Sequence, residues 1–284
     1  LIYDAAWVDA ARRDIAEARA AATTDDDRTR IGHAAHNVEA LALYLDYHAA
    51  TCAFDFAAAQ RGYEAMLAHW QKGYDENSDL VANETPSYLK RFILRFVEGA
   101  TKYSSAPYKI VHRIPDELPT FFDPQTVGHR MQYQHPSVND AQAIRTRTFS
   151  TTWDAQGLSG IRDGAVWYRI WFELPAEAGN EPVGLFIGGV EDEARVWING
   201  QAIGTSGRGF SLPFVFDLTD GIARKGKNLL AIQVARNSKA NEIGLGGIIR
   251  PCFVFTGPRL ESAAPKTLEL RRVLPGGELG EIEQ

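Results

Sequence analysis

Carboxyl side chains could catalyse hydrolysis, and in the C-terminal half of the chain their densest cluster is Glu191, Asp192 and Glu193. Two carboxyl groups can act as acid and base, or as acid and nucleophile, when a rigid cleft holds them beside the reacting bond. This cluster stands where a connection between two strands is expected, so a solvated turn is the preferred interpretation. Asp217 is expected to form a turn. We therefore predict no catalytic residue in this chain.

Histidine and glycine patterns do not indicate a metal or phosphate site. His33 and His36 are three residues apart and can share a helix face, but no acidic partner is suitably placed. His48 lies on an apolar stripe and is interpreted as a packed histidine. No GxSxG, P-loop or dinucleotide motif occurs, and residues 207–209 are too few to hold a phosphate. We predict neither a metal site nor a cofactor.

The tryptophans are a further group to weigh, because an exposed indole ring can stack on the C–H face of a pyranose while polar groups pair with its hydroxyls. Trp167, Trp171 and Trp197 alternate with aliphatic residues and are expected on the opposite side of their strands. They could form an open platform, or they could pack against another layer of the protein. Packing is the preferred interpretation.

The N-terminal part of the chain is predicted to be helical, and the C-terminal part to consist of strands. In the first hundred residues apolar side chains recur every three or four positions, which predicts four helices connected as an up-and-down bundle. Residues 25–27 are three aspartates that favour a helix start, Gly73 is expected to end a helix, and Pro86 to begin one. Five prolines between residues 107 and 136 then exclude long helices and indicate a domain junction.

From about residue 147 the pattern has a period of two, which is typical of strands exposed to different surroundings on their two faces. Asn199-Gly200 between two such strands predicts a two-residue hairpin, because both residues tolerate a positive φ. Strands separated by turn residues at this spacing predict a β-sandwich.

Several of these strands also resemble one known family in order and spacing. The segments, in chain order, are residues 118–124 with Gly128, 163–169 (DGAVWYR), 185–190, 194–200 (ARVWING), 213–219, 226–232 and 247–250. Together they resemble the sugar-binding domain of family 2 glycoside hydrolases over about residues 115–256. The resemblance implies a galactose-binding-like jelly roll. The helical half is more loosely similar to helical segments that follow catalytic barrels in bacterial glycosidase-like proteins.

The expected fold class is therefore α+β and multidomain, with an N-terminal antiparallel helical bundle followed by an antiparallel β-sandwich. We place the bundle at residues 1–105, the sandwich at 106–260, and a final strand with a C-terminal tail at 261–284. A structural calcium ion is compatible with a jelly roll, although no Asp-rich loop calls for one.

Loops at one end of the sandwich are the preferred carbohydrate contacts. The candidates are Trp153, Arg208, Asn237, Glu242 and Arg250. In the family, the loop before the last motif reaches toward the active site of the barrel, so the resemblance implies that Asn237 and Glu242 touch a glycan. The alternative is a set of ordinary solvated loop residues.

The resemblance implies an accessory role without catalysis. The family carries its catalytic glutamates on a barrel, and the 284 residues contain no barrel. We expect a non-catalytic C-terminal accessory region of a glycoside hydrolase, whose partners are an upstream catalytic domain of the same polypeptide and an oligosaccharide or polysaccharide. The alternatives are a stand-alone carbohydrate-binding protein and a purely structural interaction module. A self-sufficient hydrolase is the least favoured.

Charge and composition exclude other classes. A net charge of -6 gives no electrostatic support for binding nucleic acid or an anionic membrane. No run approaches the roughly 18 apolar residues of a membrane span. Cys52 and Cys252 fall in different segments and predict no disulfide framework. Because the chain starts at Leu1 within helix-forming sequence, we expect it to be part of a longer protein. A separate expectation is that this protein is extracellular or periplasmic.

Overall fold

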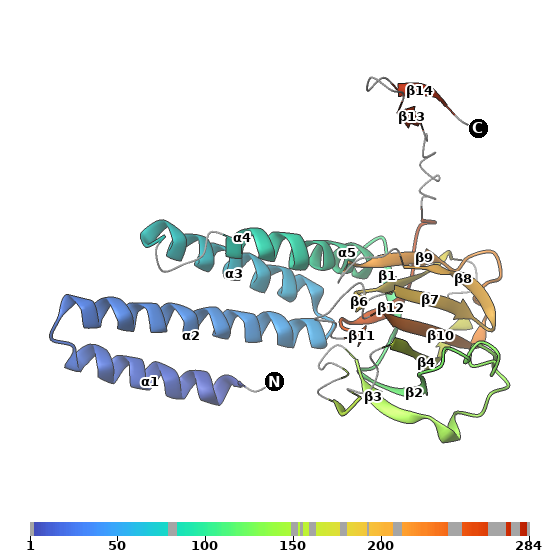
Figure 1. Cartoon of the computed structure of the whole chain (residues 1–284), viewed down its shortest axis with the longest axis horizontal. Helices are drawn as coiled ribbons and strands as arrows, with labels where there is room; N and C mark the ends of the chain where they lie inside the picture. The colour runs from blue at the N-terminus through green and yellow to red at the C-terminus, as the bar shows by residue number, and fades with distance from the viewer. Residues whose placement is uncertain are drawn as a thin grey trace.

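The computed structural model consists of helices followed by antiparallel sheets, which confirms the coarse fold class predicted from the sequence. Figure 1 shows the helices on one side and most of the strands gathered on the other. The structure describes residues 3–78, 84–148, 153, 156–158, 163–176, 181–191, 193–206, 212–237, 246–260, 271–273 and 279–282. The three domain ranges proposed above stay a prediction.

Four helical segments occupy the first 104 residues of the described chain. They are α1 (Ala5–Ala21), α2 (Asp25–Cys52), α3 (Phe56–Glu76), and a last segment composed of α4 (Glu84–Leu89), the π-turn η1 (Lys90–Leu94) and α5 (Arg95–Ser104). α1 packs against α2, α2 against α3, and α3 against α4 and α5. The helix start predicted at the three aspartates is confirmed, because Thr24 and Asp27 form a capping box there.

Gly73 does not end a helix, so this prediction is wrong. α3 continues to Glu76, and Gly73 faces the ring of His36 on α2. A Cβ atom at position 73 would lie 2.3 Å from that ring, so the glycine is needed for close packing. His36 also stacks on His69, with ring centroids 4.1 Å apart, and meets the edge of Trp70. The small size of glycine does matter at this position, but it serves the contact between α2 and α3 and not a helix end.

This histidine cluster predicts that acid destabilises the helices. Burial, followed by the charges of His69 and His33, lowers the pKa of His36, while Glu76 opposes this. As the pH falls through about 6.5, the unfolded chain therefore binds a proton at His36 before the folded chain does. Burial of the neutral imidazole favours the folded chain above that pH, and this advantage is lost as the pH falls further. His36→Leu should reduce the fall in unfolding free energy between pH 7.5 and pH 5, measured by urea denaturation. The exposed His135→Gln variant should behave as wild type, and equal pH dependence in all three proteins would contradict the prediction.

The strands form two main antiparallel sheets. One has the order β1-β12-β5-β9 and the other the order β3-β2-β4-β10-β7-β8. Their bounds are β1 (Lys109–Arg113), β2 (Glu117–Asp123), β3 (Ile144–Arg147), β4 (Asp163–Leu174), β5 (Val183–Ile187), β7 (Glu193–Ile198), β8 (Gln201–Thr205), β9 (Phe214–Asp217), β10 (Gly226–Asn237) and β12 (Cys252–Thr256). A short ladder pairs β6 (Val190–Glu191) with β11 (Gly247–Ile248).

The two main sheets share one apolar core, as in a sandwich. Alternate residues of β4 and β10 point into it, including Val166, Ile170 and Ile232. They meet Leu185 of β5 and Val254 of β12 from the facing sheet. Period two in the sequence therefore located the inner face correctly. The predicted hairpin is also confirmed, because Asn199 and Gly200 both have positive φ between β7 and β8.

The outer face of the four-stranded sheet is covered by the helices. Every residue of β5 and β12 is buried, because the sheet is covered on both sides. Phe253 lies 4.7 Å from Phe186 and 5.5 Å from Phe56 of α3, measured between ring centroids. Tyr103 of α5 stacks on Phe255 at 4.8 Å, and Gly184 opposite Phe255 leaves room for that ring. Helices and sheet thus share a second hydrophobic core.

The outer face of the six-stranded sheet is covered by the loop of residues 124–143. Tyr133 from this loop packs on Trp167, which has no exposed surface, and Trp167 lies 4.9 Å from Trp197. Packing, the preferred interpretation of these tryptophans, is therefore what the structure contains. Arg169 of β4 is fully buried between the sheet and this loop. It pairs with Asp140 and donates hydrogen bonds to three loop carbonyls, so it holds the loop on the sheet.

The last described residues form β13 (Arg271–Val273) and β14 (Leu279–Ile282), which pair with each other. Figure 1 shows this pair well separated from the two main sheets. It therefore adds nothing to the described core.

Candidate functional site

Trp153, the first predicted carbohydrate contact, is buried in the sandwich core. Only 1% of its surface is exposed, and its indole nitrogen donates a hydrogen bond of 2.7 Å to the Tyr168 hydroxyl. Gly246 and Gly247 approach its ring so closely that a Cβ on either would clash. The indole supports the end of the sandwich and offers no open stacking face. The sugar contact proposed for Trp153 stays a prediction.

Arg250 lies between the sandwich and the helices. Its guanidinium is 5.1 Å from the ring centroid of Phe96 on α5. Burial raises the pKa of Tyr47 on α2 to about 12, and the nearby charge of Arg250 opposes that rise. Among the other predicted contacts, Arg208 and Glu242 fall outside the described residues, and Asn237 is described only as the last residue of β10. The predicted set of five carbohydrate contacts therefore stays a prediction.

The buried carboxylates of the described chain are Asp123 and Glu191. Asp123 accepts hydrogen bonds from the backbone of Val127 and Gly128 and from the Trp167 indole. Glu191 lies in the β6–β11 ladder, opposite Gly247. Asp123 ends β2, and Glu191 lies just before β7 in the chain. In the six-stranded sheet, β4 and β10 lie between β2 and β7. The two acids are not arranged across a common cleft, as glycoside hydrolysis requires.

The two cysteines are unsuited to nucleophilic catalysis. Both are free thiols, and Cys252 is fully buried among strands. Burial raises the pKa of Cys252 to about 12 and also raises the pKa of Cys52. A thiol with a raised pKa is protonated near neutral pH and reacts slowly, because the thiolate is the nucleophile.

No group of three or more histidine, cysteine, aspartate or glutamate side chains in the described part of the chain is placed to hold a metal ion. None of the helices in this described part has the length and apolarity needed to cross a lipid bilayer.

The polar residues in the family-like segments have structural partners. Asp217 accepts a hydrogen bond of 2.9 Å from the backbone of Thr219, which confirms the predicted turn. Asn199 donates to Asn228, whose amide also donates to the backbone of Arg224 and Gly226. Asp217, Asn199 and Asn228 therefore stabilise turns and strand ends.

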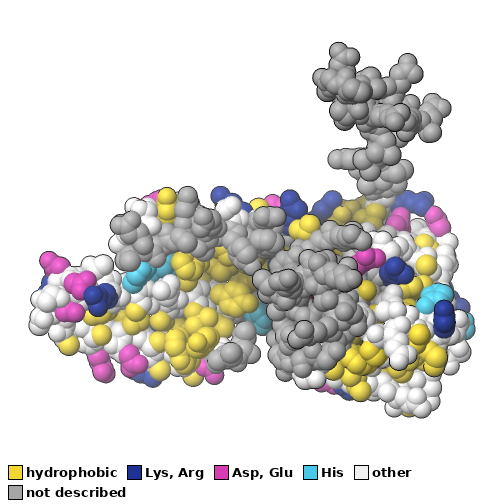
Figure 2. Space-filling model, viewed as in Figure 1, with side chains coloured by type: hydrophobic (Ala, Val, Ile, Leu, Met, Phe, Trp, Pro, Cys, Tyr) yellow, Lys and Arg dark blue, Asp and Glu magenta, His cyan; other side chains and the backbone are white. Residues whose placement is uncertain are grey.

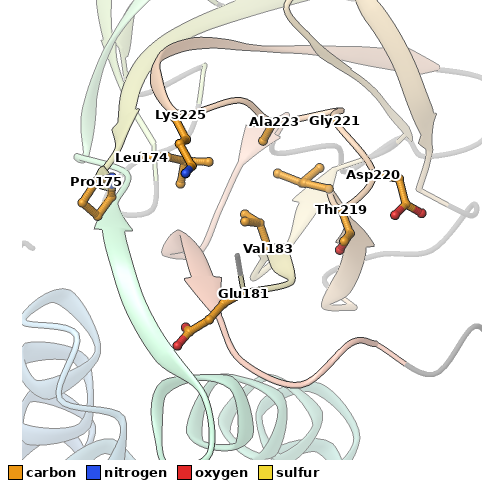
Figure 3. Close-up of a pocket in the computed structure, with 10 residues that line it drawn as sticks. Leu174, Pro175, Glu181, Val183, Thr219, Asp220, Gly221, Ala223 and Lys225 are labelled. Carbon is orange, nitrogen blue, oxygen red and sulfur yellow. The ribbon is translucent and has the colours of Figure 1, made fainter. Parts of the chain in front are cut away.

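A pocket of about 160 Å³ opens at the end of the sandwich opposite Trp153. Figure 3 shows Leu174, Pro175 and Lys225 on one side of it and Thr219 with Asp220 on the other. Val183 lies between them, and the carboxylates of Glu181 and Asp220 point in different directions. Asp220 also forms an ion pair with Arg259. The pocket thus combines an apolar floor with charged edges, but it contains no pair of facing acids.

A second hollow of about 540 Å³ adjoins this pocket. Both are lined by Leu174, Pro175 and Lys225, and the second hollow extends to Val111 and Glu173. Sequence reasoning missed these residues, because they stand singly at strand ends and form no motif. The one available sequence signal for this pocket was that charged residues stand close to a glycine or proline, as in Asp220-Gly221 and Lys225-Gly226.

One family model matches part of the sandwich. Residues 133–240 match the model described as "Beta-galactosidase second all-beta domain". This part of the chain is therefore similar to an all-β domain of β-galactosidases, which confirms the resemblance found in the sequence. The match covers less than half of the chain, and the helices lie outside it.

Individual relatives agree with this assignment. The chain is 34% identical over 97 residues to a β-galactosidase of Clostridium acetobutylicum, which covers 32% of this chain and 11% of that protein. It is 38% identical over 71 residues to a β-glucuronidase of Formosa agariphila, covering 25% and 7%. The chain thus spans about a tenth of the length of these relatives. A solved β-glucuronidase from Ruminococcus gnavus is 20% identical, with a TM-score of 0.45, over 54% of this chain and 30% of that one.

Proposed function

We propose that this chain is a non-catalytic accessory region of a glycoside hydrolase-like protein, which supports a catalytic domain and binds carbohydrate. The observation that carries the proposal is the match of its sandwich to an all-β domain of β-galactosidases. In this proposal the sandwich is a galactose-binding-like jelly roll and the helices are a bundle. The protein acts outside the cytoplasm, where polysaccharides are available.

The shared aromatic core supports the role of a rigid accessory region. Phe186 and Phe253 of the sheet interlock with Phe56 and Phe96 of the helices. Interfaces of this kind resemble domain cores and resist relative motion. The helices and the sandwich would therefore support a neighbouring domain as one body.

Exposed aromatic residues on the helices support contact with such a domain. On the face shown in Figure 2, hydrophobic side chains gather over the helices beside the sandwich. Tyr3, Trp7 and Tyr44 are each more than a third exposed. Contiguous apolar surface often marks a protein contact. We propose that the catalytic domain of the same polypeptide is the partner.

Two measurements on the 284-residue chain test the proposal. Calorimetric titration with β-linked galacto-oligosaccharides should give a binding isotherm, while aryl β-galactosides and aryl β-glucuronides should remain unhydrolysed. Turnover that is lost on replacing one carboxylate would overturn the non-catalytic assignment. Absence of binding to any glycan would leave a structural interaction module. A gene without a catalytic segment in the same reading frame would favour a stand-alone carbohydrate-binding protein.

A further inference from the structure

We propose that the two adjoining hollows at the sandwich end form one groove that binds a neutral oligosaccharide, and that Lys225 and Glu181 contact its hydroxyl groups. This inference rests on the proposed carbohydrate-binding function and gives it a location. The groove lies away from Trp153 and the loops that the sequence favoured.

The dimensions of the groove suit a ligand longer than one sugar. The larger hollow, of about 540 Å³, is within the range of small-molecule sites, whereas the smaller, of about 160 Å³, is below it. Leu174, Pro175 and Lys225 line both, so the two hollows adjoin at these residues. A chain of sugar residues could extend from one into the other.

The lining provides both kinds of contact that a sugar needs. Leu174, Val183 and Pro175 form an apolar floor for the C–H faces of a pyranose ring. Lys225 and Glu181 are exposed at its edges, and neither forms a hydrogen bond or ion pair with another described residue. An ammonium group donates hydrogen bonds and a carboxylate accepts them, so together they match hydroxyl groups, which do both.

The charge balance selects among sugars. Glu173, Glu181 and Lys225 contribute two negative charges and one positive charge to the groove. The carboxylate of Asp220 is already paired with Arg259. An acidic sugar would meet a net negative lining, and like charges disfavour binding. A neutral oligosaccharide is therefore the expected ligand, in preference to a uronic acid.

The backbone that carries the floor is held by the sheets. Leu174 at the end of β4 pairs with Gly226 at the start of β10, next to Lys225. Val183 begins β5, and its carbonyl accepts from the backbone of Leu218. Sites placed on paired strand ends lose little conformational freedom on binding.

The test compares Lys225→Met with Lys227→Met. Lys227 is also exposed and lies two residues away, but its ammonium stands 4.4 Å from the centroid of the Trp171 ring and does not line the groove. Calorimetric titration of the full chain with a neutral galacto-oligosaccharide should show affinity about tenfold weaker for Lys225→Met, as expected for one lost charged hydrogen bond. Glu181→Gln should weaken it in the same direction, and Lys227→Met should leave it unchanged.

A second arm uses the corresponding oligosaccharide that carries a uronic acid, which should bind more weakly than the neutral one. Equal affinity of the wild type and Lys225→Met for the neutral ligand would overturn the groove while leaving the proposed function intact. A wild-type chain that binds no glycan would overturn both. Tighter binding of the uronic acid would overturn the choice of ligand class.

Discussion

Replacing Phe253 with alanine is expected to lower the free energy of unfolding by about 3–5 kcal/mol. The side chain is fully buried between sheet and helix, with Phe186 and Phe56 on its two sides. Removing the ring opens a cavity where the surrounding aromatic rings are held by both elements and cannot close in. Urea denaturation followed by circular dichroism measures the change.

Phe122→Ala is the matched control. Phe122 lies on β2 of the other sheet and is 40% exposed, so its truncation should change stability by less than about 0.5 kcal/mol. If both variants lost the same stability, the helices would not pack on the four-stranded sheet in solution. The rigid accessory region proposed above would then lose its physical basis.

The sequence identified the inner faces of the sandwich because burial there follows a simple alternation. Val166, Ile170 and Ile232 point inward as the period of two predicted. The same pattern could not show what covers the outer faces. Phe186 and Phe253 are one residue out of phase with the core residues beside them, and only the structure shows that helices bury them.

The loop of residues 124–143 could not be predicted, because it has no periodic pattern of apolar residues. The sequence favoured packing for Trp167 and Trp197 but could not show what covers them. They are packed because Phe121 and Tyr133 cover them, and because Asp123 holds the loop start beside Trp167. Arg169, which the sequence offered only as part of a motif, fixes this arrangement.

The sequence offered less information on the candidate site than on the fold. Trp153 was selected as an aromatic residue near a loop, but one hydrogen bond to Tyr168 and two glycines place it in the core. Lys225 and Glu181 lie 44 residues apart in the sequence and precede strands of different sheets, and the packing of the two sheets brings both to one pocket. Such a site depends on tertiary arrangement, and no local spacing reports it.

Replacing Arg169 with alanine should be as costly as the loss of Phe253, about 3–5 kcal/mol, because a buried charged partner is removed. Its guanidinium pairs with Asp140 and donates to the carbonyls of His135 and Val138 at 3.0 and 3.1 Å. Asp140 also accepts a hydrogen bond of 2.7 Å from the Trp171 indole. The substitution removes the guanidinium, so the Asp140 carboxylate and the carbonyls of His135 and Val138 lose their hydrogen-bond donor.

Limited proteolysis should locate the damage. Arg130 is exposed within the loop, so trypsin should cleave after it much faster in Arg169→Ala than in the wild type. The control is Arg195→Ala, because Arg195 is 60% exposed and its ion pair with Glu193 is 3.7 Å long. Exposed pairs contribute about 0–1 kcal/mol, so this variant should resist trypsin as the wild type does.

A double-mutant cycle separates the ion pair from the carbonyl contacts. Asp140→Ala combined with Arg169→Ala should cost less than the sum of the two single changes, since each single change leaves the other charge unpaired. Strictly additive costs would mean that Asp140 and Arg169 act independently. The loop would then be held by the carbonyl contacts and the aromatic packing of Tyr133 and Trp167.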